Sequence, residues 1–130
     1  MIKNILRIID KFYIKLMIST SGWLYCFLFN FRALMLGRDV RFKYLKHKNY
    51  LVKDKFGQRY FKTEKLGFSF YNKGIKSRAL EIGNDYHLDK IEFFSNDFII
   101  DCGANVGDLK LYFDYKKINV DYFGIEASEE

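Results

Sequence analysis

Apolar residues recur at helical spacing at the start of the chain. Between Met1 and Met17 they stand three to four positions apart, which predicts a helix with an apolar stripe. Basic residues fall four apart beside this stripe: Lys3, Arg7, Lys11 and Lys15. We favour a helix that packs on the rest of the domain. The alternative is a helix that lies in a membrane interface.

A second apolar run follows the Ser19-Thr20-Ser21-Gly22 interruption. Trp23 to Leu36 is apolar nearly all round and predicts a helix that ends at the turn Gly37-Arg38-Asp39. The uncharged run from Leu16 to Phe31 spans about 16 residues, short of the roughly 20 that a spanning helix needs. We therefore expect a buried helix or one that lies against a membrane, rather than a transmembrane span or a signal peptide.

The middle of the chain carries shorter patterns. Val40 to Asn49 is basic with interleaved aromatic residues, and we interpret it as a solvated face because no nucleic-acid-binding motif accompanies it. Tyr50 to Val52, Arg59 to Lys62 and Phe68 to Tyr71 predict the short strands of a small β-meander. Ser77 to Ile91 predicts helical pieces that are broken at Gly83-Asn84-Asp85.

The clearest pattern begins near residue 98. Phe98 to Ile100 is typical of a buried parallel strand, and it leads through Asp101 into a glycine-containing turn. Asp108 to Lys117 then predicts a helix, and Val120 to Glu126 predicts a second strand that ends on a carboxylate. Strand, glycine turn, helix, strand and terminal acid follow one another in the order of a nucleotide-binding βαβ unit.

Composition changes this picture only slightly. The 130 residues carry a formal net charge of +6, mostly from lysines before the glycine turn, which suits anionic surroundings but is also usual for a solubilising surface. Cys26 and Cys102 are the only cysteines, so we expect no disulfide framework and a reduced, cytoplasmic setting. His47 and His87 have no partners at ligand spacing, and no metal site is predicted.

The residues around the turn favour a cationic ligand. A dinucleotide site uses G-x-G-x-x-G, whereas this turn has Gly103 and Gly107 with Asn105 in the place of the middle glycine. Asp101 precedes the turn, and Glu126 is predicted to face the same crevice. Carboxylates repel a pyrophosphate but suit S-adenosylmethionine, whose amino group and sulfonium are positive and whose ribose offers two hydroxyls to an acid.

At these residues the chain resembles the FkbM family of S-adenosylmethionine-dependent methyltransferases. Asp-Cys-Gly-Ala-Asn-Val-Gly-Asp at 101–108 resembles the first motif of that family, and Gly-Ile-Glu-Ala-Ser at 124–128 resembles the second. The resemblance implies that one group of residues lines the methionine end of the cofactor: Asp101, Gly103, Ala104, Asn105 and Gly107. It also implies that Glu126 holds the ribose hydroxyls.

The expected fold is therefore α/β, a Rossmann-like class I methyltransferase fold of which only the first βαβ unit is present. We expect an N-terminal helical region, a β-rich and helical lead-in, and the start of the cofactor domain, at 1–39, 40–96 and 97–130 respectively. The family's fold continues beyond the second strand, whereas this sequence ends at Glu130. We accordingly expect the N-terminal part of a longer enzyme, which by itself is prone to aggregate and binds the cofactor weakly.

The expected activity is O-methylation of a hydroxyl on a sugar, a glycan or a related metabolite. Two alternatives stay open: a non-catalytic fragment of such an enzyme, and a fragment of a dinucleotide-binding oxidoreductase. No general base is assigned, because we expect Asp108 to cap its helix. Arg78 is expected to be a surface charge and Tyr86 to be a packing residue; the alternative, implied by the resemblance, is that they lie near the cofactor or the acceptor. Expected partners are a small-molecule or glycan acceptor and, through the N-terminal helices, a membrane surface, but no nucleic acid; the oligomeric state is not predicted.

Overall fold

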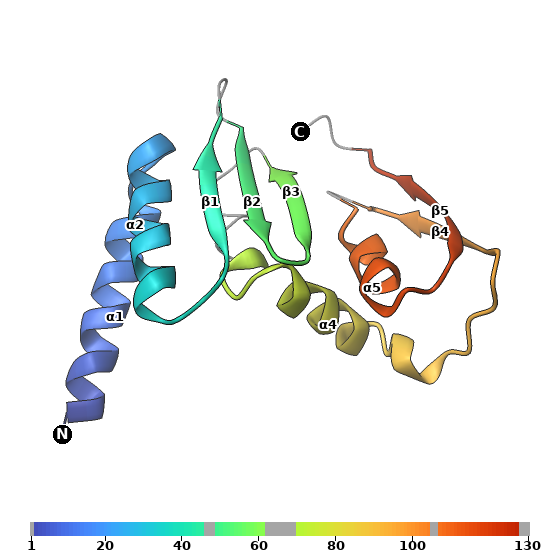
Figure 1. The fold of residues 1–130 in the computed structure, drawn as a ribbon, viewed down its shortest axis with the longest axis horizontal. Coiled ribbons are helices and arrows are strands. Elements are labelled where there is room, and N and C mark those ends of the chain that lie inside the picture. Colours follow the sequence, from blue (N-terminus) through green and yellow to red (C-terminus); the bar gives the residue numbers. More distant parts are fainter. Residues whose placement is uncertain (1, 46–48, 62–69, 105–106, 128–130) are drawn as a thin grey trace.

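A computed structural model describes residues 2–45, 49–61, 70–104 and 107–127, with side chains from residue 7 onward. The chain forms an α/β arrangement. Figure 1 shows a helical hairpin at one end of the molecule, a parallel strand–helix–strand unit at the other, and a three-stranded sheet between them. The elements are α1 Ile2–Ile18, α2 Gly22–Met35, β1 Arg41–Tyr44, β2 Tyr50–Asp54, β3 Gly57–Phe61, α4 Ile75–Asp85, the 3-10 turn η1 Leu88–Lys90, β4 Asp97–Cys102, α5 Asp108–Lys116 and β5 Val120–Ile125.

Helices α1 and α2 confirm the two helices that the N-terminal pattern predicts. One face of α2 is buried against the sheet and carries Tyr25, Cys26, Phe29 and Ala33. The two helices are joined by an ion pair between Asp10 and Arg32 (2.9 Å) and by a hydrogen bond from the Tyr13 hydroxyl to the carbonyl of Leu28 (2.8 Å). In the described part of the chain, no helix has the combined length and apolar character that crossing a bilayer requires.

The antiparallel sheet β1-β2-β3 forms the predicted meander, but its strands differ from the prediction. The interpretation of Val40 to Asn49 as a solvated face is wrong for β1, whose Phe42 is buried beneath α2 while Arg41 and Lys43 point outward. One buried residue in a four-residue strand is too short an alternation to recognise. A strand at Phe68 to Tyr71 is also wrong where the chain is described, since Phe70 and Tyr71 are helical; Phe68 lies outside the described residues.

Helix α4 runs without interruption through Gly83, where a break was predicted. The glycine serves packing: a Cβ at this position would lie 2.5 Å from the ring of Tyr112 on α5. Two helices therefore approach closely at a residue that looks like a helix breaker in the sequence. The helix ends at Asp85 with Tyr86 as its C-cap residue, and His87 follows with a left-handed backbone (φ 53°).

The predicted strand–helix–strand unit is confirmed. β4 and β5 pair in parallel, from Asp97 opposite Val120 to Cys102 opposite Ile125, with α5 between them in the chain. Ile99 and Val120 pack towards α5, whereas the other face of the pair exposes Phe98, Ile100, Phe123 and Ile125. β4 is thus not buried on both faces as its apolar run predicts, because only one helix covers this two-stranded sheet in the described structure.

Candidate functional site

The candidate site lies at the carboxyl ends of β4 and β5. In open α/β sheets, ligands bind at this edge because loops there connect strand ends to helix starts. Both strands point the same way, with α5 against one of their faces (Figure 1). Asp101 pairs with Gly124 in the strand register, and Glu126 comes two residues after Gly124. The fold therefore brings Asp101 and Glu126 to one edge of the sheet, as the motif spacing predicts.

The turn after β4 is built on two glycines with left-handed backbones. Gly103 has φ 83° and Gly107 has φ 73°, values that cost other residues roughly 1–2 kcal/mol. The N–H groups of Gly103 and Ala104 both donate to the carbonyl of Ile125, at 2.8 and 3.0 Å, and these bonds tie the turn to the end of β5. Asn105, which the motif places in the site, lies outside the described residues.

The two glycines of the turn have free space beside them. Among the described residues, a Cβ added to Gly103 or to Gly107 would meet no atom within 4 Å beyond the adjoining residues, so a ligand can approach the backbone at both positions. Gly124 differs, because a Cβ there would lie 3.0 Å from the Cβ of Ala104. Ala104 therefore packs on β5, and its side chain helps to shape the turn.

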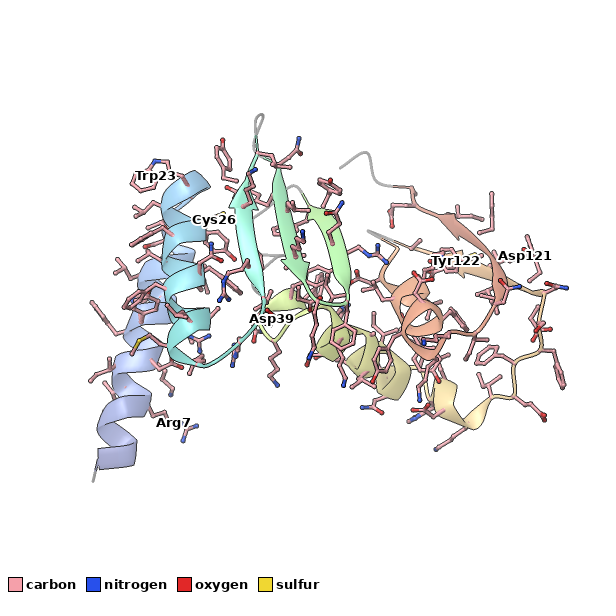
Figure 2. All side chains as sticks on the ribbon, viewed as in Figure 1. Arg7, Trp23, Cys26, Asp39, Asp121 and Tyr122 are labelled. Atoms are coloured by element: carbon pink, nitrogen blue, oxygen red, sulfur yellow. The ribbon has the colours of Figure 1, made fainter. Side chains whose placement is uncertain are left out.

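Tyr122 is a site residue that the sequence reasoning missed. Its hydroxyl donates a hydrogen bond to Oδ2 of Asp101, and burial followed by this bond raises the pKa of the phenol. Tyr122 lies on the α5 side of β5, whereas its neighbour Asp121 lies on the other side (Figure 2). The alternation of side chains along β5 could have revealed Tyr122 as a site residue. Tyr122 and Gly124 lie on the same face of the strand, and Gly124 is paired with Asp101. The bond orients Asp101 and leaves acceptor positions for a ligand, because a carboxylate can accept about four hydrogen bonds.

Asp108 does not have the predicted capping role. Gly107 occupies the N-cap position and has no side chain to cap α5, and Asp108 is buried with 7% of its surface exposed. Its carboxylate accepts hydrogen bonds from the Tyr71 hydroxyl and from Nε of Arg78, the latter at 2.9 Å. Helix starts can tolerate a buried carboxylate because their free N–H groups carry partial positive charge.

Arg78 is correspondingly not a surface charge. Its side chain is 15% exposed, and it also pairs with Glu81 (3.0 Å) and lies 4.2 Å from the ring centre of Phe70. We call Tyr71, Arg78 and Asp108 the buried triad. It joins α4 and the segment before it to the first residue of α5, which directly follows Gly107 of the turn. One further prediction is wrong, because Tyr86 is 65% exposed rather than packed. Cys102, at the end of β4, is exposed.

The buried triad predicts a loss of stability at high pH. Burial, and then the Asp108 carboxylate, raise the pKa of the Tyr71 phenol in the folded chain. Below about pH 10 the phenol is protonated in both states, so it adds no pH dependence. Above that pH the unfolded chain releases the proton and the folded chain retains it, so the free energy of unfolding falls by about 1.4 kcal/mol per pH unit.

Urea unfolding of the wild type and of Tyr71→Phe, each measured from about pH 9 to pH 11, would detect this loss. Lysines and other tyrosines titrate in both proteins, so the difference between the two slopes isolates Tyr71. Equal slopes would contradict the prediction.

A separate cleft lies away from the glycine turn. It has a volume of about 430 Å³ and is lined by β3 and its preceding turn, α4 and α5, with Phe56, Arg59, Lys76 and Tyr115 among its residues. Neither Asp101, Gly103, Gly107 nor Glu126 lines it. The open turn and this cleft are therefore distinct features, and only the turn carries the motif residues.

No protein-family model, no curated protein and no solved structure matches this chain. The interpretation of the site accordingly depends on its own geometry and on the motif. That geometry consists of two accessible glycine positions and two carboxylates at one sheet edge, and it offers acceptor oxygens to a ligand that carries positive charge and hydroxyl groups.

Proposed function

We propose that the glycine turn and its two carboxylates form the S-adenosylmethionine-binding part of a Rossmann-like methyltransferase domain. The observation that carries the proposal is the position of Asp101 and Glu126 at the carboxyl ends of adjacent parallel strands, beside a turn with left-handed glycines. S-adenosylmethionine would supply an electrophilic methyl group on a sulfonium. The chain's own residues would hold that donor in place.

Charge and hydrogen bonding favour this ligand over a dinucleotide. A pyrophosphate needs free N–H groups at the turn, but Gly103 and Ala104 already donate theirs to Ile125. It would also meet the negative charges of Asp101 and Glu126. A cationic amino group or sulfonium gains from the same charges, and a ribose can donate its hydroxyls to Glu126.

The backbone supports the same ligand. The accessible surfaces of Gly103 and Gly107 allow a flat or extended ligand to approach the main chain closely. Tyr122 holds Asp101 in one orientation through its hydroxyl. Such pre-orientation lowers the entropy that binding would otherwise cost.

The acceptor side of the reaction is assigned only by chemical class. Methyl transfer requires the acceptor oxygen to be close to the methyl group and in line with the bond that breaks, in a site that excludes water. Asp108 is not a suitable base for a hydroxyl acceptor, because it is buried and paired with Arg78. A sugar or glycan hydroxyl as acceptor follows from the resemblance to the FkbM family.

Ligand binding tests the proposal. Saturation-transfer NMR on the 130-residue chain should detect S-adenosylhomocysteine, weakly bound, and should detect no NADH. Asp101→Asn should weaken this binding by roughly tenfold or more, because it removes a charge-assisted hydrogen bond. Asp121→Asn is the matched control, since it removes a carboxylate from the same two-stranded sheet, near the amino end of β5.

The proposal fails if NADH binds and S-adenosylhomocysteine does not, a result that would favour an oxidoreductase. It also fails if the two asparagine variants bind S-adenosylhomocysteine equally well.

A further inference from the structure

Helix α1 exposes an apolar row beside a basic row. Ile8, Phe12 and Leu16 are four residues apart and are 67%, 70% and 47% exposed. Arg7, Lys11 and Lys15 each stand one position before an apolar residue of this row, so the two rows run side by side, about 100° apart around the helix. Such a helix has the form of an interfacial membrane helix, with lipid-soluble side chains on one side and cations on the polar side.

Helix α2 carries a longer apolar row on its outer face. Trp23, Phe27, Phe31 and Met35 are four apart and are 71%, 60%, 50% and 71% exposed. Figure 2 shows Trp23 projecting from α2 away from the sheet, while Cys26 lies on the sheet side. The outward face of α2 is thus apolar along its whole length, although its inward face already supplies the core.

The charges of the α1–α2 hairpin indicate which kind of partner covers the apolar rows of the two helices. In the first 38 residues the basic side chains are Lys3, Arg7, Lys11, Lys15, Arg32 and Arg38, whereas the acidic side chain is Asp10 alone. Asp10 is already bound by Arg32 through two hydrogen bonds, at 2.9 and 3.0 Å. We propose that the outer face of the α1–α2 hairpin binds the surface of an anionic lipid bilayer, with the apolar rows among the acyl chains and the lysines beside the lipid phosphates.

A second copy of the chain complements this face less well. Two hairpins that met through their apolar rows would bring two sets of basic residues together, with no free carboxylate from Asp10 to offset them. A membrane that contains acidic phospholipids supplies both an apolar layer and negative charge. Each lysine or arginine near such a surface contributes on the order of 1 kcal/mol, a factor of roughly five in affinity.

Vesicle flotation with the 130-residue chain tests the proposal, because aggregated protein stays at the bottom of the gradient. The chain should float with vesicles of phosphatidylcholine and phosphatidylglycerol, and much less with phosphatidylcholine alone or at high salt. Trp23 is the chain's single tryptophan, so its fluorescence should shift to shorter wavelength on binding. This outcome does not depend on S-adenosylmethionine binding.

Three variants locate the contact. Phe27→Gln/Phe31→Gln should lower the partition coefficient at least tenfold, because it removes apolar area that the bilayer would bury. Lys11→Gln/Lys15→Gln should lower it roughly tenfold or more on anionic vesicles only. Phe98→Thr/Phe123→Thr, which changes the exposed face of β4 and β5 instead, should leave it unchanged.

Three results would overturn the proposal. The first is no flotation with anionic vesicles, and the second is flotation that all three variants retain equally. The third is a dimer, detected by analytical ultracentrifugation, that Phe27→Gln/Phe31→Gln abolishes in a chain that does not bind vesicles. That last result would assign the face to a second copy.

Discussion

Replacing Arg78 with leucine is expected to lower the free energy of unfolding by about 3–5 kcal/mol, because it leaves the Asp108 carboxylate buried without a cation. The side chains of Arg78 and Asp108 are 15% and 10% exposed, so water cannot replace the lost partner. The residual hydrogen bond from Tyr71 is too weak to compensate for a buried charge. Urea unfolding followed by far-ultraviolet circular dichroism would measure the loss.

Two comparisons distinguish this explanation from a general loss of packing. Arg59→Leu breaks the Arg59–Asp114 pair (3.5 Å), whose side chains are 31% and 48% exposed, and should cost at most about 1 kcal/mol. Arg78→Leu/Asp108→Leu removes both charges and should be more stable than Arg78→Leu alone. A double variant that is less stable than Arg78→Leu would show that the ion pair is not the source of the effect.

The buried triad also shows why the candidate site could be predicted only in part. The glycine turn, the strand–helix–strand order and the acids Asp101 and Glu126 follow one another in a single short stretch of the chain. The order and spacing of these residues therefore predict them. The triad joins positions that are 30 and 37 residues apart, which no local pattern reveals. A carboxylate at the start of a helix is usually a cap, and only the tertiary contact with Arg78 makes it a buried partner.

The fold, like the candidate site, could be predicted only in part. α1, α2, α5 and β5 have patterns long enough to be recognised, and the structure confirms them. β1 was missed because a single buried residue, Phe42, marks its inner face. The break predicted at Gly83 is wrong because glycine has two opposite uses: it ends helices, and it also allows another element to approach, here the ring of Tyr112. Distinguishing these uses requires knowledge of the neighbouring helix.

Phe42 is expected to be the residue that joins the α1–α2 hairpin to the sheet. Its ring centre lies 3.8 Å from that of Phe29 on α2 and 5.4 Å from that of Phe61 on β3, and the side chain is buried. The side-chain amide of Asn30 on α2 both donates to and accepts from the backbone of Phe42, at 2.8 Å each way. A substitution with alanine would leave these backbone bonds but open a cavity beneath them.

Phe42→Ala should therefore lower the free energy of unfolding by about 3–5 kcal/mol, the range found for large aromatic residues in cores. Tyr60→Ala, on the same sheet but 59% exposed, should change it by less than about 0.5 kcal/mol. Equilibrium urea unfolding would compare the two. If both variants unfolded like the wild type, α2 would not pack on the sheet through Phe42. Phe42 is not on the outer face of the hairpin that is proposed to bind lipid. Phe42→Ala should therefore weaken the attachment of the hairpin to the sheet without removing a residue that would contact the membrane.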